Sequence, residues 1–66
     1  MKIQLNGQER ILEKTANISE LVIELGLEPR SVLIEHNQTA LHRSEWSTCI
    51  VSEGDFVEIL FISAGG

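Results

Sequence analysis

The spacing of apolar residues changes period early in the chain, and no other feature restricts the fold as strongly. Over "KIQLNGQERILE", Ile3 and Leu5 alternate with polar residues, which is the period of a strand with one solvated face. Asn6 and Gly7 form a dipeptide preferred in two-residue hairpin turns, where both central residues need a positive φ. The segment therefore predicts two strands joined by a tight turn, the second running roughly over 8–13.

Helical spacing follows directly after this hairpin. Four apolar residues lie at i, i+3, i+4 and i+7, namely Ile18, Leu21, Val22 and Leu25. Asn17 is a favourable N-cap, and Glu20 stands three residues later as in a capping box. Gly26 can adopt the left-handed conformation that ends a helix, and Pro29 prevents its continuation. A helix so short and one-sided is expected to lie on a sheet.

The remaining segments complete the predicted sheet. "SVLIEHNQTAL" indicates a strand with Val32, Ile34 and His36 on one face, a turn at 37–38 and a second strand. An irregular stretch over 42–55 follows, with Trp46 and Ile50 as expected apolar anchors and a turn at its end. "FVEILFI" is nearly continuous in apolar residues, as in a central strand.

This order of elements predicts the β-grasp arrangement. A hairpin is followed by a helix that crosses it, and the final strand lies centrally and parallel to the first, since long crossovers join parallel strands. The expected fold class is α+β, a mixed sheet with one covering helix. We expect one domain over 1–66, with a flexible tail at about 63–66.

The last predicted strand has one face that Glu58 marks as solvated. The opposite face, which we expect to contact the helix, carries Val57, Ile59 and Phe61. Phe56, Leu60 and Ile62 share the face of Glu58, and Leu60 and Ile62 are expected to be exposed. Contiguous exposed apolar residues usually mark a partner-binding surface. The alternative is that the segment around Trp46 covers them.

Charge and composition exclude several function classes. The formal net charge is −5 and the few basic residues do not cluster, which disfavours binding to nucleic acid. There is no basic-then-apolar leader and no long apolar run, so neither secretion nor membrane spanning is indicated, and we expect a cytoplasmic protein. So short a chain favours a carrier, a modifier or an interaction module over an enzyme.

Few residues carry recognisable catalytic or metal-binding patterns. His36 and His42 could meet across a hairpin but lack further ligands, so no metal site is predicted. Cys49 could carry sulfur as a persulfide, although a single thiol is more often a small buried residue. Three carboxylates, those of Glu20, Glu24 and Glu28, are expected to form a solvated helix face.

The sequence finishes on Ser63, Ala64, Gly65 and Gly66. Two glycines pack poorly and are costly to order, so a structural role is unconvincing. One interpretation is a frayed end. The other is that the carboxylate of Gly66 reacts inside a partner's nucleotide pocket, because a segment without Cβ atoms can pass a narrow channel. The β-grasp pattern before the tail favours the second interpretation.

Several segments together resemble the ThiS-type sulfur carriers of thiamin thiazole biosynthesis. They are "IQLNG", "ISELVIELGL", "LIEHNQ", "EGDFVEIL" and the terminal glycines, in that order over nearly the whole chain. The chain departs from the family at Asn37 and Gln38, where Asn-Gly is frequent. The resemblance implies a carrier that acts as co-substrate of partner enzymes and is not itself an enzyme.

The resemblance also implies a reaction sequence at the tail. A ThiF-like adenylyltransferase would adenylate the carboxylate of Gly66, with Gly65 beside it, using ATP and Mg²⁺; the carrier itself would bind no cofactor. Sulfur from a donor such as a cysteine desulfurase would then form a thiocarboxylate, and a ThiG-like thiazole synthase would accept that sulfur. Phe56, Leu60 and Ile62, with Ser63 and Ala64, are the expected partner-binding residues.

Three alternatives share much of this pattern. The small subunit of molybdopterin synthase has the same terminal chemistry with a different acceptor, and is usually longer. A ubiquitin-like modifier would end in an amide bond to lysine. A passive β-grasp interaction module would make no use of the glycines.

Overall fold

The computed structural model describes residues 1–62. In chain order its elements are β1 (Lys2–Leu5), β2 (Gln8–Ile11), α1 (Ile18–Glu24), η1 (Pro29–Ser31), β3 (Val32–His36), β4 (Thr39–Leu41), η2 (Arg43–Thr48) and β5 (Phe56–Phe61). The strands form one sheet in the order β2-β1-β5-β3-β4. β5 is central, parallel to β1 and antiparallel to β3, which confirms the predicted β-grasp arrangement.

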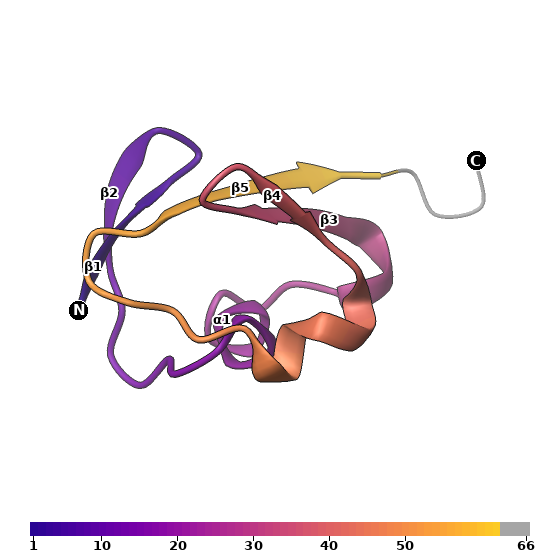
Figure 1. Cartoon of the computed structure of the whole chain (residues 1–66), viewed down its shortest axis with the longest axis horizontal. Helices are drawn as coiled ribbons and strands as arrows, with labels where there is room; N and C mark the ends of the chain where they lie inside the picture. The colour runs from indigo at the N-terminus through magenta and orange to yellow at the C-terminus, as the bar shows by residue number, and fades with distance from the viewer. Residues whose placement is uncertain (63–66) are drawn as a thin grey trace.

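One layer of helix lies on one face of this sheet. Figure 1 shows α1 and η2 on the same side of the strands, while no helix or strand of residues 1–62 lies on the opposite side. Within residues 1–62 the structure contains no helix of the length and apolar character needed to cross a membrane.

Two asparagine-led turns set the strand register. Asn6 and Gly7 have φ of 49° and 81°, as a type I′ hairpin turn requires. Asn37 and Gln38 have φ of 48° and 72°, so the turn without glycine adopts the same left-handed conformation at both positions. Glutamine in place of the frequent glycine at position 38 therefore keeps the turn type and adds backbone strain.

Replacing Gln38 by glycine is expected to stabilise the protein. A residue with a Cβ in the left-handed region costs about 1–2 kcal/mol, and glycine avoids this at an entropic cost of about 0.5–1 kcal/mol. The net gain should raise the thermal unfolding midpoint by a few degrees. Calorimetry of Gln38→Gly beside Gln38→Ala measures it, and an unchanged or lower midpoint for the glycine variant would contradict the strain argument.

The caps of α1 follow the sequence signals closely. The side chain of Asn17 accepts a hydrogen bond from the backbone N–H of Glu20 at 2.9 Å. Gly26 has φ of 71°, and its N–H donates to the carbonyl of Ile23, while the N–H of Leu27 donates to that of Val22. This pair of bonds is the Schellman termination, which uses the glycine at the position where a positive φ is needed.

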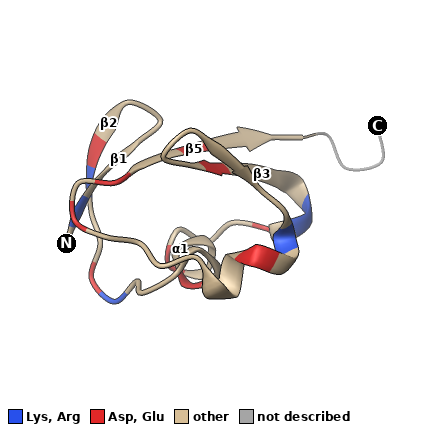
Figure 2. Ribbon diagram, in the orientation of Figure 1, with Lys and Arg blue, Asp and Glu red and all other residues tan. Residues whose placement is uncertain are grey.

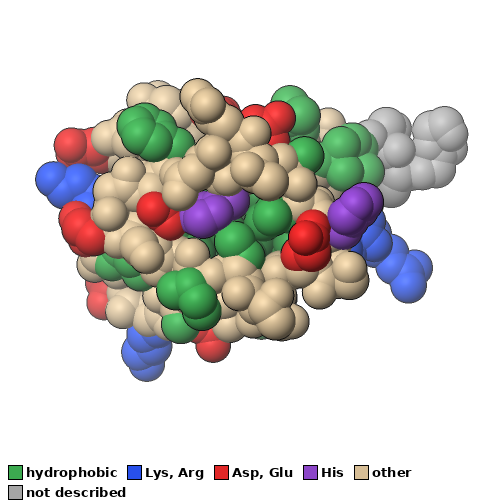
Figure 3. Space-filling model, viewed as in Figure 1, with side chains coloured by type: hydrophobic (Ala, Val, Ile, Leu, Met, Phe, Trp, Pro, Cys, Tyr) green, Lys and Arg blue, Asp and Glu red, His purple; other side chains and the backbone are tan. Residues whose placement is uncertain are grey.

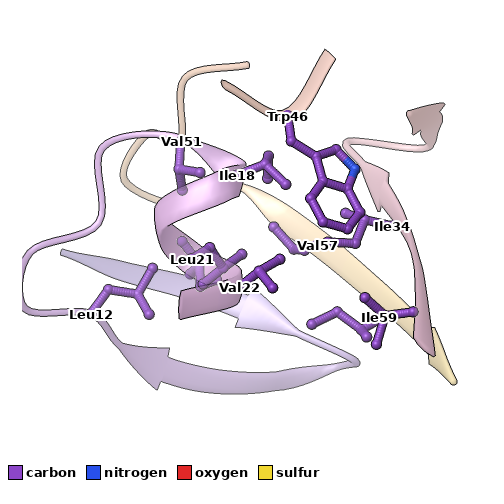
Figure 4. Packing of buried hydrophobic residues seen from close by; sticks show 11 residues of the cluster. Leu12, Ile18, Leu21, Val22, Ile34, Trp46, Val51, Val57 and Ile59 are labelled. Carbon is purple, nitrogen blue, oxygen red and sulfur yellow. The ribbon is translucent and has the colours of Figure 1, made fainter. Parts of the chain in front are cut away.

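The core lies between α1, η2 and the covered face of the sheet (Figure 4). Its buried apolar members are Ile3, Leu12, Ile18, Leu21, Val22, Val32, Ile34, Trp46, Val51, Val57 and Ile59. The prediction of Ile50 as an anchor was wrong, because Ile50 is 61% exposed and its neighbour Val51 is buried. Ile50 forms an antiparallel bridge with Asn17, and in extended chain alternate side chains point to opposite sides.

Phe61 does not contact the core as predicted. Its side chain is 68% exposed, although Val57 and Ile59 on the same face of β5 are buried. β1 pairs with β5 only as far as Val57, so the end of β5 has β3 as its single neighbouring strand. Figure 1 shows this end of β5 reaching past α1.

Candidate functional site

The uncovered face of the sheet carries a patch of exposed apolar side chains along β5 and the neighbouring β3. The members of this apolar patch are Leu33 (49% exposed), Phe56 (59%), Leu60 (59%) and Ile62 (39%). Leu33 and Leu60 lie directly opposite each other on β3 and β5. Figure 3 shows hydrophobic side chains at the surface near the place where the described chain ends. Such a patch is a common feature of protein-binding surfaces.

The segment around Trp46 does not cover the apolar patch. Trp46 is only 5% exposed and belongs to the core on the helix side of the sheet. The sequence-based alternative, in which this segment shields Leu60 and Ile62, is therefore wrong. Sequence reasoning also did not identify Leu33, although its position between the buried Val32 and Ile34 implies the opposite face.

Hydrogen bonds from two turn residues fix the position of β5. The side-chain amide of Asn6 accepts from the N–H of Ile59 at 2.6 Å and donates to its carbonyl at 3.2 Å. Asn37 accepts from the N–H of Phe56 at 2.8 Å. At the far end of β5, the N–H of Ile62 donates to the carbonyl of Ser31 at 2.8 Å. β5 is therefore held on both sides. It carries Phe56 and Leu60 of the apolar patch, and Ile62 follows its last residue.

A second cluster, of titratable groups, lies at the other end of β5. Nε2 of His36 is 2.6 Å from Oδ2 of Asp55, and Nδ1 of His36 is 3.3 Å from Sγ of Cys49. The N–H of Ser52 donates to Asp55 at 2.8 Å, and the amide of Asn37 donates at 3.3 Å. The cluster therefore fastens β3 to the turn that precedes β5.

The pKa values in this cluster follow from burial and hydrogen bonding. Burial raises the pKa of the Cys49 thiol, and the nearby carboxylates of Asp55 and Glu45 raise it further. Burial alone would raise the pKa of Asp55, but hydrogen bonds from His36, Ser52 and Asn37 outweigh it and lower the pKa below its usual value. A protonated thiol is a poor nucleophile, which disfavours a persulfide role for Cys49.

His36 and His42, considered above as a pair across the hairpin, have different partners in the structure. His36 contacts Asp55 and Cys49, whereas His42 precedes η2 and its backbone N–H donates to Glu45 at 2.8 Å. Within residues 1–62, no group of three or more histidine, cysteine and acidic side chains is arranged to hold a metal ion.

The carboxylates predicted as a solvated helix face also cap backbone groups. Glu24 accepts hydrogen bonds from the N–H groups of Glu13 and Lys14 and from the hydroxyl of Thr15. Glu20 accepts from the N–H of Ala16, and Glu28 from that of Arg30. A depression beside Ile23 is lined by Glu13, Lys14, Glu20 and Glu24. Of its acids, Glu20 and Glu24 accept the structural hydrogen bonds described above.

Four of the predicted site residues lie outside the described part of the chain: Ser63, Ala64, Gly65 and Gly66. Their predicted roles stay predictions. The other three predicted partner-binding residues are exposed on the uncovered face: Phe56, Leu60 and Ile62. Their role in binding also stays a prediction.

Comparisons with known proteins give consistent results. The model of the ThiS family matches residues 3–66. A crystal structure of the thiamine biosynthesis protein ThiS from Geobacter metallireducens superposes with a TM-score of 0.85 at 29% identity, with both chains covered completely. An NMR structure of a thiamine biosynthesis protein from the same organism gives 0.82, covering this chain completely and 88% of the other.

Two longer relatives are thiazole synthases. The chain is 33% identical to the one from Paramagnetospirillum magneticum and 30% identical to the one from Magnetococcus marinus, in both cases over its full length. It spans 20% of the length of each of these two relatives. An uncharacterised protein, ycf40, from Trieres chinensis is 27% identical over 94% of this chain and 85% of its own.

Proposed function

Because the chain belongs to the ThiS family, we propose that it is a sulfur carrier in thiamin biosynthesis. The family match over residues 3–66 is the observation that carries this proposal. It extends through Gly66, the residue whose carboxylate would hold the sulfur. Burial and the carboxylates of Asp55 and Glu45 raise the pKa of the Cys49 thiol, which makes it a weaker nucleophile and favours Gly66 over Cys49 as the site that carries sulfur.

The chemistry proposed for Gly66 proceeds in three displacements. Its carboxylate oxygen attacks the α-phosphate of ATP in a ThiF-like enzyme and releases pyrophosphate, with Mg²⁺ supplied at that enzyme's site. The terminal sulfur of a protein persulfide, formed by a cysteine desulfurase system, then attacks the acyl adenylate and displaces AMP, which gives an acyl disulfide. A thiol of the partner system attacks the outer sulfur of that disulfide, forms a new disulfide with it and releases the thiocarboxylate. The partner enzymes supply the catalytic groups, and the carrier supplies the reacting terminus and the surface that docks.

Thiazole synthase is the proposed acceptor of the sulfur. Two relatives that contain a segment similar to this whole chain are named thiazole synthases. The apolar patch, which runs along β5 and includes Ile62 just after it, is the surface proposed to dock that enzyme. Docking there would place the residues after Ile62 next to the partner.

Intact-mass measurement tests the carrier function. Incubation with ATP, the adenylating enzyme and a sulfur donor is expected to replace one oxygen of the protein by sulfur. Removal of Gly65 and Gly66 should abolish this mass change and leave the unfolding midpoint unchanged. A full-length chain that gains no sulfur would contradict the carrier, and a covalent adduct with lysine of another protein would indicate a modifier instead.

A further inference from the structure

Two carboxylates lie opposite each other within the uncovered face of the sheet. Glu35 on β3 lies directly opposite Glu58 on β5. Two residues further along the strands, on the same face, Leu33 lies opposite Leu60. Directly opposite residues in an antiparallel pair have Cβ atoms about 4.5–5.5 Å apart and side chains on the same face. Figure 2 shows acidic positions in both strands. Like charges in this arrangement destabilise a sheet.

The described chain provides no cation for these two carboxylates. Within residues 1–62 the ion pairs are Lys2 with Glu9 and His36 with Asp55, and neither involves Glu35 or Glu58. The basic residues of the chain are Lys2, Arg10, Lys14, Arg30 and Arg43, so that none belongs to β3 or β5. Glu35 is already half-buried. Within residues 1–62, no ion pair therefore offsets the charge of either carboxylate.

The position of the acidic pair makes it part of any complex formed through the apolar patch. The pair of Leu33 and Leu60 lies next to the acidic pair on one side, on the same face of the sheet. On the other side lies Phe56, two residues before Glu58 in β5. A partner that covers these apolar side chains also removes water from the carboxylates between them. A carboxylate buried without a cation costs several kcal/mol, so a matching partner must supply positive charge at this point.

We propose that the acidic pair of Glu35 and Glu58 binds an arginine side chain of the docked thiazole synthase. The inference rests on the proposed function, from which it takes the partner. A guanidinium is planar, carries five N–H donors and is weakly hydrated, so that one group can donate to two neighbouring carboxylates. A lysine ammonium is a compact and strongly hydrated charge, and fits a shared site between two carboxylates less well. The free carrier thus gives up some stability for selectivity towards this partner.

Neutral substitutions separate binding from stability in this proposal. Glu35→Gln and Glu58→Gln are each expected to weaken the affinity for thiazole synthase about tenfold, because each leaves the partner's cation with one carboxylate. The same changes should raise the unfolding midpoint of the free carrier by a few degrees, since they remove the cross-strand repulsion. Titration calorimetry and thermal unfolding measure the two effects.

The matched control is Glu13→Gln, which removes the same charge from an exposed position beside α1. It should leave the affinity within about twofold. When surface arginines of thiazole synthase are replaced by glutamate one at a time, one variant should bind the wild-type carrier poorly and recover binding with the Glu58→Arg carrier; if no variant does so, the arginine site is overturned.

Leu60→Asp makes the two proposals distinguishable. If Leu60→Asp weakens binding while the glutamine variants bind like the wild type, the docking surface stands and the arginine site is overturned. If the wild-type carrier does not bind thiazole synthase, or Leu60→Asp has no effect, the proposed docking itself is wrong and the arginine site is overturned with it. Weakened binding in all these variants, with Glu13→Gln unaffected, supports both.

Discussion

Replacing Leu60 by aspartate is expected to weaken binding to thiazole synthase about thirtyfold or more. Leu60 is 59% exposed and lies at the centre of the apolar patch, opposite Leu33. Truncation or replacement of a central apolar contact costs about 2 kcal/mol or more, which is about thirtyfold in affinity. Aspartate adds the cost of burying a charge next to Glu58. Titration calorimetry of the purified proteins gives the affinity directly.

The fold should tolerate this substitution, and that is what makes the test informative. The side chain of Leu60 does not belong to the core, and β-propensity differences span only about 1 kcal/mol. Ile62→Asp should behave similarly at the edge of the patch. Ile23→Asp is the matched control, because Ile23 is 76% exposed but lies on α1, on the other side of the sheet. Equal losses for Ile23 and Leu60 would contradict a localised docking surface.

The fold was largely predictable because local signals agreed with one another. The period change, the Asn-Gly turn and the glycine after α1 each specified a local conformation that the structure contains. The central strand followed from its nearly continuous apolar character. These signals depend on neighbouring residues, and a single sequence is enough to read them.

The two wrong predictions, for Phe61 and Ile50, concern which side chains are covered by other elements. The alternation of apolar and polar residues along a strand does not determine this. Alternation placed Phe61 on the face of Val57 and Ile59, but it could not show that the side chain of Phe61 stays exposed at the end of the strand. In the irregular crossing, Ile50 and Val51 are adjacent and equally apolar. The choice between them depends on the bridge to Asn17, which is a tertiary contact.

The contacts that hold β5 were also invisible in the sequence. Asn6 was predicted as a turn residue, yet its side chain also bonds Ile59, 53 positions away. His36 was weighed as a partner of His42, whereas its actual partners come from the segment before β5. One signal could have indicated this: His36 shares a face with Val32 and Ile34, and a half-buried imidazole needs a hydrogen-bond partner. Asp55 is that partner.

Asp55→Asn is expected to destabilise the protein at neutral pH by about 1–3 kcal/mol. Donors from His36, Ser52 and Asn37 surround the carboxylate, and an amide in its place accepts through one oxygen only and turns an N–H₂ group towards a donor. For a domain of this size the loss lowers the unfolding midpoint by about 4–8 °C per kcal/mol. Chemical denaturation at pH 7 measures the free energy of unfolding.

The same substitution should make the protein less sensitive to acid, and the sign follows from the pKa of Asp55. This pKa is lower in the folded protein than the ordinary value of 3.8, so the unfolded chain takes up a proton first as the pH falls. The carboxylate's contribution is therefore fully present above about pH 4–5 and is lost as the pH falls through the folded-state pKa. Glu24, whose pKa hydrogen bonds also lower, is present in both proteins and adds the same slope. Between about pH 5 and pH 2 the unfolding free energy should thus fall less steeply in Asp55→Asn than in the wild type, and parallel curves would show that Asp55 is not bound in the folded state as the structure describes.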